Sequence, residues 1–199
     1  MKTRLYVITG LPGVGKTTVA KELERRAAEK GIPLQVINYG DVMLEIARSE
    51  LGVENRDFMR KLPLDKQISL QQKAARKIRQ MVEKASVVVD THLIIKVGEN
   101  EYWCGLPVSV LEILKPFKLF LVEASPEEIL SRRKADKSSR IRDEEELEKI
   151  KEAIQLSRTA AVVVGELTGA SFKIVYNREG RAGEAAEEIL AEIRADMYG

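Results

Sequence analysis

A glycine-rich segment near the N-terminus constrains this chain more than any other feature. Residues 10–17 read GLPGVGKT and match the pattern G-x-x-x-x-G-K-[ST] at every fixed position. An apolar, β-branched run at Leu5–Thr9 precedes the segment, and apolar residues at helical spacing follow over Thr18–Lys30. Glycines let backbone N–H groups curl around an anion, and the start of a helix adds unpaired donors and the positive end of its dipole. The segment therefore predicts a phosphate loop (P-loop) that binds a nucleoside triphosphate, and a chance glycine-rich turn is the alternative.

Individual positions of the P-loop have expected roles. Lys16 can reach the β- and γ-phosphates of a bound triphosphate, and the Thr17 hydroxyl can ligate Mg²⁺. A second apolar run ends in a carboxylate at Asp90, where a P-loop fold places the acid that holds the magnesium shell from the other side. The alternative for Asp90 is an acid that caps the following turn. The sequence thus predicts a Mg²⁺ site formed by Thr17 and Asp90.

Composition excludes several classes of function. The 199 residues fit one domain, and 33 Lys and Arg against 31 Asp and Glu leave a net charge of +2. That balance favours neither a nucleic-acid nor a membrane partner. One cysteine and one histidine exclude an intrachain disulfide and a cysteine-rich zinc site. No stretch approaches the ~20 apolar residues of a membrane span, and the first apolar run is too short for a signal-peptide core. We expect a cytoplasmic protein, a single domain over residues 1–199.

Apolar runs alternate with helical patterns along the whole chain. This alternation predicts an α/β fold, in which a five-stranded parallel sheet carries helices on both faces. Two charged stretches, Glu54–Lys66 and Lys134–Glu148, look like insertions over the carboxyl ends of the strands, where ligands bind in such folds. Trp103 and Cys104 read as packing residues in a loop, without a chemical role. The runs expected as strands are Leu5–Thr9, Leu34–Asn38, Val87–Asp90, Leu119–Glu123 and Phe172–Tyr176.

Five arginines surround the second charged stretch. At about 100° per residue, Arg158 falls in the middle of the apolar stripe of its predicted helix, where a surface arginine does not belong. A solvated side chain is the simplest interpretation of any one of the five. Together they exceed what the charge balance needs, and guanidinium groups neutralise a transferring phosphoryl group bidentately. The five are Arg132, Arg133, Arg140, Arg142 and Arg158.

Several longer segments together resemble the archaeal adenylate kinases. They are residues 10–17 (GLPGVGKT), 38–41 (NYGD), 56–61 (RDFMRK), 90–92 (DTH), 105–107 (GLP) and 167–170 (LTGA). The likeness extends from residue 4 to about residue 195, and the segments at 56–61, 90–92 and 167–170 are the most specific. The resemblance implies a P-loop kinase fold and reversible transfer of the ATP γ-phosphoryl group to AMP, which gives two ADP and uses Mg²⁺.

The resemblance also implies residue roles. Residues 41–66 become a monophosphate-binding insertion and residues 134–142 a short lid, and the family suggests a homotrimer with exposed apolar helix positions as its interface. ATP would lie at Gly10, Leu11, Pro12, Gly13, Val14, Gly15, Lys16, Thr17 and Thr18. AMP would lie near Asn38, Gly40, Asp41, Arg56, Arg60 and His92. The catalytic residues would be Lys16, Arg132, Arg133, Arg140, Arg142 and Arg158.

One departure from the bacterial and eukaryotic adenylate kinases bears on the acceptor. In those enzymes an arginine for the AMP phosphate soon follows a Gly-Asp pair, whereas Gly40-Asp41 is followed by no arginine until Arg48. Arg56, Arg60 and Lys96 are then the nearest cations for that phosphate. The single histidine, His92, suits a hydrogen bond to nucleotide or to a carboxylate better than general-base chemistry.

Two other functions stay open on the sequence. A P-loop kinase for another nucleotide or a hydroxyl-bearing metabolite would need a carboxylate base, and Asp41 or Asp90 could serve. A GTP-binding switch would need an Asn-Lys-x-Asp guanine motif, but residues 177–180 read NREG and lack both the lysine and the acid. The residues alone do not fix the acceptor base.

Overall fold

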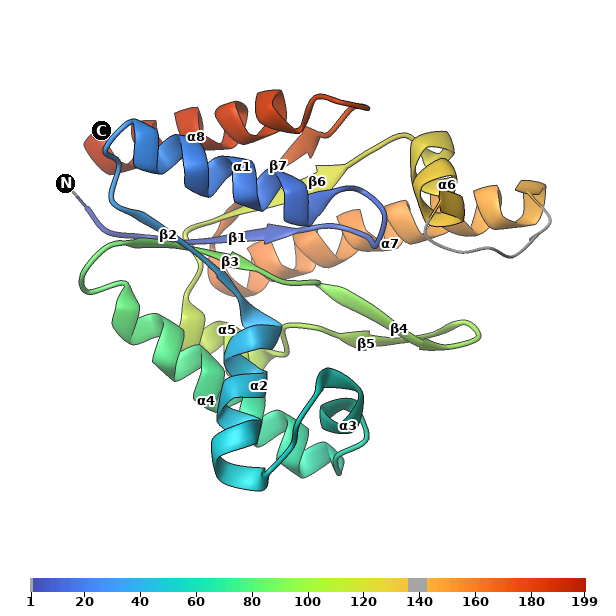
Figure 1. Ribbon diagram of the computed structural model, residues 1–199, viewed down its shortest axis with the longest axis horizontal. Coiled ribbons are helices and arrows are strands. Elements are labelled where there is room, and N and C mark those ends of the chain that lie inside the picture. Colours follow the sequence, from blue (N-terminus) through green and yellow to red (C-terminus); the bar gives the residue numbers. More distant parts are fainter. Residues whose placement is uncertain (1, 136–142) are drawn as a thin grey trace.

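The computed structural model describes residues 2–135 and 143–199, and within them the chain forms a five-stranded parallel sheet (Figure 1). Each strand predicted from an apolar run is confirmed, with bounds shifted by at most one residue. The spatial order is β2 (Leu34–Asn38), β3 (Ser86–Asp90), β1 (Leu5–Thr9), β6 (Lys118–Glu123) and β7 (Ser171–Tyr176).

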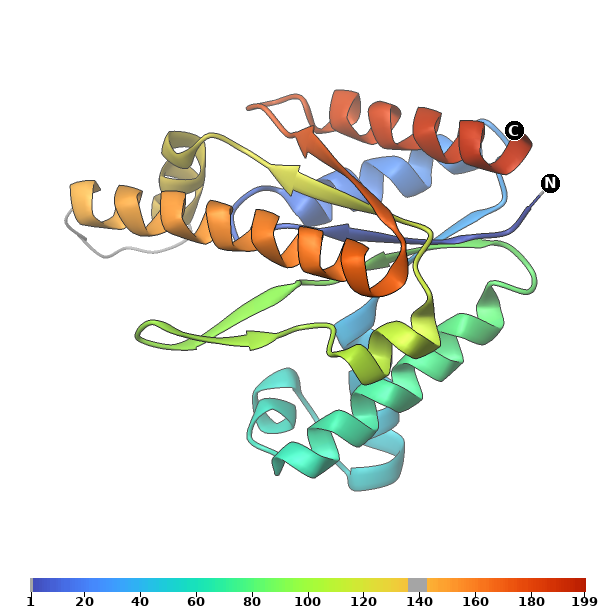
Figure 2. The ribbon, with the colours of Figure 1, turned by 180° about the vertical axis from the view of Figure 1, so that it is seen from behind.

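Helices cover both faces of the sheet, as expected for parallel strands (Figures 1 and 2). On one face lie α1 (Lys16–Glu29) and α8 (Ala182–Tyr198), and on the other lie α4 (Leu64–Met81), α5 (Val108–Leu114) and α7 (Asp143–Thr168). An apolar cluster fills each of the two interfaces. Three further helices are α2 (Tyr39–Leu51), which packs against α4, α3 (Arg56–Arg60), which packs against α2, and α6 (Pro126–Ala135), which packs against α7.

Local sequence signals explain where helices begin and end. At the start of α6, the Ser125 Oγ accepts a hydrogen bond from the Glu128 N–H at 3.1 Å, and the Glu128 carboxylate accepts one from the Ser125 N–H at 2.9 Å. This reciprocal pair is a capping box, and it fixes the first turn of α6 next to the P-loop. In α8, Ala185, Ile189 and Ile193 recur at helical spacing on one face, and this face is buried against α1.

The sequence did not predict an antiparallel hairpin that follows β3. Its strands are β4 (Ile94–Gly98) and β5 (Glu101–Cys104). The expectation that Trp103 and Cys104 pack inside a loop is wrong, because both lie on β5 and are exposed, Trp103 by 43%. A hairpin with exposed residues on both faces lacks the apolar alternation that marks a half-buried strand. Gly105 closes its base, where an added Cβ would lie 1.8 Å from the His92 carbonyl oxygen.

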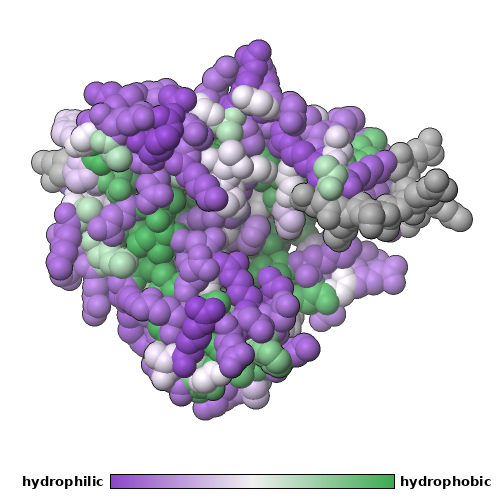
Figure 3. Space-filling model, viewed as in Figure 1, coloured by the Kyte–Doolittle hydropathy of each residue, from purple (hydrophilic) through white to green (hydrophobic). Residues whose placement is uncertain are grey.

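The carboxyl ends of the parallel strands meet at one edge of the sheet, next to the P-loop. On the side shown in Figure 3 the surface is mainly polar, and apolar side chains show in a hollow between the two layers of helices. The termini lie at the opposite end (Figure 1). No helix in the described ranges is long and apolar enough to cross a membrane. Residues 136–142 of the expected lid, with Arg140 and Arg142, lie outside the described residues.

Candidate phosphoryl-transfer site

The P-loop connects β1 to α1 in the arrangement that the sequence predicts. Gly13 and Gly15 have φ values of 95° and 81°, a left-handed backbone that glycine adopts without strain. Gly15 is the N-cap of α1, and no side chain caps that helix. The N-terminal donors of α1 therefore stay available to an anion, together with the positive end of the helix dipole.

Lys16 and Asp90 form a buried ion pair at the floor of the site. The Lys16 Nζ donates to the Asp90 Oδ1, and the two residues are 6% and 4% exposed. Burial first, and the positive charge of Arg56 as a smaller cause, together lower the pKa of Lys16 to about 8. The Asp90 Oδ2 accepts a second hydrogen bond, from the Asn38 Nδ2 at 3.1 Å. The P-loop lysine and the acid at the end of β3 thus face each other, a contact that the sequence did not predict.

A chain of polar contacts continues from Asp90 into the acceptor segment. The Asn38 Oδ1 accepts a hydrogen bond from the Arg56 Nη2 at 2.8 Å, and the same Nη2 donates to the Asp41 Oδ1 at 2.7 Å. Asn38 also caps α2, because its Oδ1 accepts from the Asp41 N–H at 3.2 Å. The structure therefore brings Asn38, Asp41 and Arg56 together beside the P-loop lysine.

Other residues expected near AMP are held less closely. Arg60 is exposed and pairs with Asp57 one turn earlier on α3, at 3.3 Å. Lys96 is exposed on β4. Gly40 lies under the Arg56 guanidinium, whose Cζ would be 3.2 Å from a Cβ at that position. Only Arg56 among the expected acceptor cations is therefore already fixed by side chains of the site.

His92 contacts the P-loop backbone. Its Nδ1 lies 2.9 Å from the Gly10 carbonyl oxygen, so the Nδ1 must carry the proton and donate. Burial lowers the pKa of His92, and the charge of Lys16 lowers it further, which favours the neutral ring. The Nδ1 thus bonds to a backbone carbonyl, and the expected hydrogen bond from His92 to a nucleotide or a carboxylate stays a prediction.

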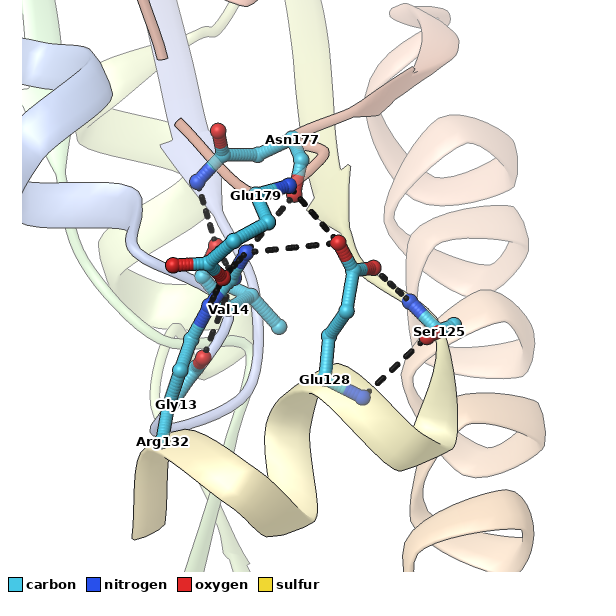
Figure 4. A network of polar contacts seen from close by, with 7 residues as sticks. All are labelled: Gly13, Val14, Ser125, Glu128, Arg132, Asn177 and Glu179. Atoms are coloured by element: carbon cyan, nitrogen blue, oxygen red, sulfur yellow. Dashed lines mark hydrogen bonds and ion pairs between the residues drawn. The ribbon is translucent and has the colours of Figure 1, made fainter. Parts of the chain in front are cut away.

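Two arginines of α6 also donate hydrogen bonds to the P-loop backbone. The Arg132 Nη1 donates to the Val14 carbonyl oxygen at 3.2 Å and lies 3.5 Å from that of Gly13 (Figure 4). The Arg133 Nε donates to the Pro12 carbonyl oxygen at 3.0 Å, and its Nη1 lies 3.3 Å from the Glu146 carboxylate. Three successive carbonyl groups of the loop are thus turned toward α6.

Arg158 lies in the apolar stripe of α7, as its spacing predicts, and its partner there is a carboxylate. Its Nε and Nη2 donate to the two oxygens of Glu123 at 2.8 and 2.6 Å, and Glu123 is 4% exposed. Beside this pair is a cavity of about 430 Å³, lined by α6, α7 and the ends of β6 and β7. Glu123, at the end of a strand, is the buried partner that the sequence analysis missed, although the odd position of Arg158 was its signal.

The sequence analysis also missed Asn177 and Glu128 as parts of the site. Asn177 follows β7 directly, is 4% exposed, and donates from its Nδ2 to the Val14 carbonyl oxygen at 2.8 Å. The Glu128 Oε1 accepts from the Glu179 N–H at 2.7 Å and thereby ties α6 to the loop that carries Asn177 (Figure 4). In the sequence, the signal for both is weak, because residues 177–180 read only as a short polar segment after the last strand.

The donor set suits Mg²⁺. Thr17 is an exposed residue in the first turn of α1, and Asp90 supplies a carboxylate at the end of β3 that pairs with Lys16, the residue before it. Mg²⁺ in nucleotide enzymes takes one or two protein oxygens and completes its shell with phosphates and water. In the described parts of the chain, no group of three or more His, Cys, Asp or Glu could hold a metal without a substrate.

Comparisons with known proteins identify the family. A family profile described as an AAA domain matches residues 9–151. An adenylate kinase of Methanopyrus kandleri is 45% identical over 96% of this chain and 98% of that protein. An adenylate kinase of Methanocaldococcus jannaschii is 43% identical over 98% and 100%, and one of Saccharolobus solfataricus is 42% identical over 94% and 97%.

Solved structures resemble the fold at much lower identity. A shikimate kinase from Acinetobacter baumannii superposes with a TM-score of 0.54 at 15% identity, covering 99% of this chain and 96% of that one. A shikimate kinase from Bacteroides thetaiotaomicron gives 0.56 at 14% identity, covering 96% and 98%. These likenesses show a kinase fold alone. The near full-length identity to the three relatives shows more, and the chain belongs to the adenylate kinases, a family of phosphotransferases.

Proposed function

We propose that this protein transfers the γ-phosphoryl group of ATP reversibly to AMP, with Mg²⁺, and so forms two ADP. The observation that carries the proposal is the continuous line of contacts from Lys16 through Asp90 and Asn38 to Arg56. It supports the proposal because Lys16, taken as the cation for the donor phosphates, and Arg56, taken as the cation for the acceptor phosphate, lie on either side of one carboxylate. A phosphoryl group in transit between two phosphates needs this separation of positive charges.

The chain's own residues supply positioning and charge. The N–H groups of the P-loop and of the first turn of α1 hold the ATP phosphates, and Lys16 exchanges Asp90 for a phosphate oxygen. Thr17 and Asp90 hold the Mg²⁺, which neutralises phosphate charge when it is bound. The attacking AMP oxygen is already ionised, so no base is required. The two carboxylates that a hydroxyl acceptor could use as bases, Asp41 and Asp90, are both engaged with cations.

On the acceptor side, we propose that Arg56 binds the AMP phosphate first and that Arg60 adds a second contact. Asn38, Gly40, Asp41 and His92 are proposed to complete this side, and residues 41–66, which carry Arg56 and Arg60, are proposed to be the monophosphate-binding insertion. Arg56 already faces the site, whereas Arg60 must leave Asp57 to reach a phosphate. A charge-assisted hydrogen bond to phosphate compensates for losing an exposed pair that contributes little.

The remaining catalytic assignments are also proposals. Arg132, Arg133 and Arg158 are proposed to support the transferring phosphoryl group from α6 and α7. Arg140 and Arg142, within a lid over residues 134–142, are proposed to stabilise charge in the transition state.

We also propose a homo-oligomer, with a trimer as its specific form, that uses an apolar patch on α7. Val162, Val163 and Leu167 expose 54%, 49% and 53% of their surface and lie within two turns of this helix. Neighbouring exposed apolar residues of this kind mark protein contacts more often than isolated ones do. Sedimentation of the wild type against Val162→Glu/Leu167→Glu tests the patch. A monomer at every wild-type concentration would remove the proposal.

The activity is tested by following ADP formation from ATP and each monophosphate in turn, with and without EDTA. We expect turnover with AMP that is far faster than with GMP, CMP or UMP, and that EDTA abolishes it. A hydroxyl acceptor such as shikimate is the control for the alternative kinase class. Turnover with that acceptor and none with AMP would overturn the proposed function.

A further inference from the structure

The side chain that follows the last strand of the sheet holds the P-loop by one carbonyl group. The Asn177 Nδ2 donates to the Val14 carbonyl oxygen at 2.8 Å, and the Arg132 Nη1 donates to the same oxygen at 3.2 Å (Figure 4). Two donors from different elements, the end of β7 and α6, therefore converge on one peptide group of the loop. The side-chain amide of Asn177 is buried, since this residue is 4% exposed.

Because of peptide geometry, the hydrogen bonds to the Val14 carbonyl also affect the N–H group that the loop presents to a phosphate. A trans peptide is rigid and planar, so its C=O and N–H groups point in opposite directions. The carbonyl of Val14 belongs to the same peptide plane as the N–H of Gly15. When Asn177 and Arg132 fix that carbonyl, they also fix the direction of the Gly15 N–H. Gly15 caps α1, where N–H groups point at a bound anion.

We propose that Asn177 is a positioning residue for the donor phosphates, which aims the Gly15 N–H by holding the Val14 carbonyl. The inference rests on the proposed function only in taking the P-loop as the ATP site. The glycine itself supports it, because a Cβ on Gly15 would lie 2.4 Å from the Asn177 Nδ2. Only a residue without a side chain leaves room for the amide at this point.

The loop that carries Asn177 is itself held in place. The Asn177 N–H donates to the Glu123 carbonyl oxygen at 2.7 Å, and its own carbonyl accepts from the Arg132 Nη2 at 3.3 Å. The Glu179 N–H donates to Glu128 on α6 at 2.7 Å. The amide is thus presented to the P-loop from a fixed backbone, and this kind of support is what a positioning contact requires.

The oxygen of the Asn177 side-chain amide indicates why position 177 is an asparagine. Its Oδ1 is buried and has no hydrogen-bond partner among the described residues. A buried acceptor without a partner lowers stability, so a purely structural position would be better filled by an apolar side chain. The donor contact with Val14 is the benefit that offsets this cost. An alternative use of the Oδ1, as an acceptor for a base of the nucleotide, makes a different prediction in the following test.

The test measures binding of inorganic tripolyphosphate, ATP and adenosine by calorimetry, together with KM for ATP and AMP. Asn177→Asp replaces the donor by a carboxylate oxygen that faces the Val14 carbonyl, and Asn177→Ala removes the donor and leaves Arg132. Asn100→Asp is the matched control, since it makes the same chemical change in the exposed turn between β4 and β5. Circular dichroism and thermal midpoints confirm that each variant is folded at the assay temperature.

We expect Asn177→Asp to raise the Kd of tripolyphosphate and of ATP by about tenfold, with a smaller rise for Asn177→Ala. KM for AMP and the Kd of adenosine should stay within about twofold of the wild type, as in Asn100→Asp. Equal losses for ATP and AMP in folded protein would overturn the proposal, as would an unchanged tripolyphosphate Kd with weaker adenosine binding. Should the aspartate variant not fold, the alanine variant decides by the same readouts. Tripolyphosphate binding tests this inference even where the wild type turns over no AMP.

Discussion

The site has two halves: a donor half, the P-loop proposed to bind ATP, and an acceptor half, the residues around Arg56 and Arg60 proposed to bind AMP. Side chains of other elements hold the donor half far more firmly than the acceptor half. Side chains from three separate parts of the chain donate hydrogen bonds to carbonyl groups of the P-loop. They are His92 after β3, Arg132 and Arg133 on α6, and Asn177 after β7. On the acceptor side, Arg56 is held by Asn38 at the end of β2 and by Asp41 on α2, and Arg60 pairs with Asp57 on the same short helix.

The difference follows from what each half must bind. A triphosphate is recognised largely by backbone N–H groups, and a backbone cradle works only when each peptide plane is fixed in advance. A monophosphate is recognised by long side chains, which can reorient at a small cost when they are exposed. We therefore expect changes on the donor side to reduce turnover or stability strongly, and changes on the acceptor side to act on AMP affinity.

The largest expected effect is at the centre of the donor half. Lys16→Met should lower kcat by at least about 10³-fold, or roughly 4 kcal/mol, because the lysine stabilises charge on the migrating phosphoryl group. Lys21→Met, an exposed lysine on the same helix, is the control and should retain wild-type kcat. A folded Lys16→Met protein that keeps a tenth of the wild-type turnover would refute the role.

The next largest effect is expected at Arg158, where stability and catalysis can be separated. Arg158→Ala leaves the buried Glu123 without a partner and should lower the free energy of unfolding by about 3 kcal/mol. A double variant, Glu123→Leu/Arg158→Met, should recover most of that loss, because an apolar pair can replace a partly buried ion pair at little cost. Urea unfolding and kcat are measured on both. Full recovery of kcat in the double variant would leave Arg158 a structural role alone.

Substitutions in the acceptor half should change the KM for AMP rather than kcat or stability. Arg60→Ala is expected to raise KM for AMP by about 10- to 100-fold, since a charge-assisted hydrogen bond contributes about 1.5–3 kcal/mol, and to leave KM for ATP within twofold. Arg76→Ala, an exposed arginine on α4, is the matched control. If the ATP KM rose and AMP binding was unchanged, the two halves of the site would have to be exchanged.

Much of the donor half could be predicted from the sequence because its signals are local. The P-loop, the acid at Asp90 and the capping box at Ser125 each depend on residues a few positions apart, so their spacing alone indicates the structure. The five strands are likewise marked by apolar runs, since a parallel sheet is buried on both faces.

The contacts that support the P-loop could not be predicted in the same way. Asn177 reaches Val14 across 163 positions of sequence, and Glu123 reaches Arg158 across 35. Such pairs are formed by the topology of the sheet, which brings the ends of β1, β6 and β7 together. Arg132 and Arg133 were predicted as catalytic from charge, and the sequence could not show that their donors face backbone carbonyls.

The smallest expected effect concerns the outer support of the donor half, at Glu128. Hydrogen bonds from the Ser125 backbone first, and from the Glu179 backbone as well, lower the pKa of Glu128 below its usual value of 4.5. The folded state therefore favours the ionised carboxylate, and its contribution to stability is present above pH 4.5 and lost as the pH falls through the lowered folded pKa. Glu128→Gln should be less stable than the wild type by about 1 kcal/mol at pH 7, and this difference should shrink as the pH falls below 4.5. Urea unfolding at pH 7 and pH 3 measures it, with Glu127→Gln, exposed on the same helix, as the control. A difference that stays constant between the two pH values would show that the amide merely packs less well. A rise in the ATP Kd of more than about threefold at pH 7 would place Glu128 closer to the phosphates than an outer support.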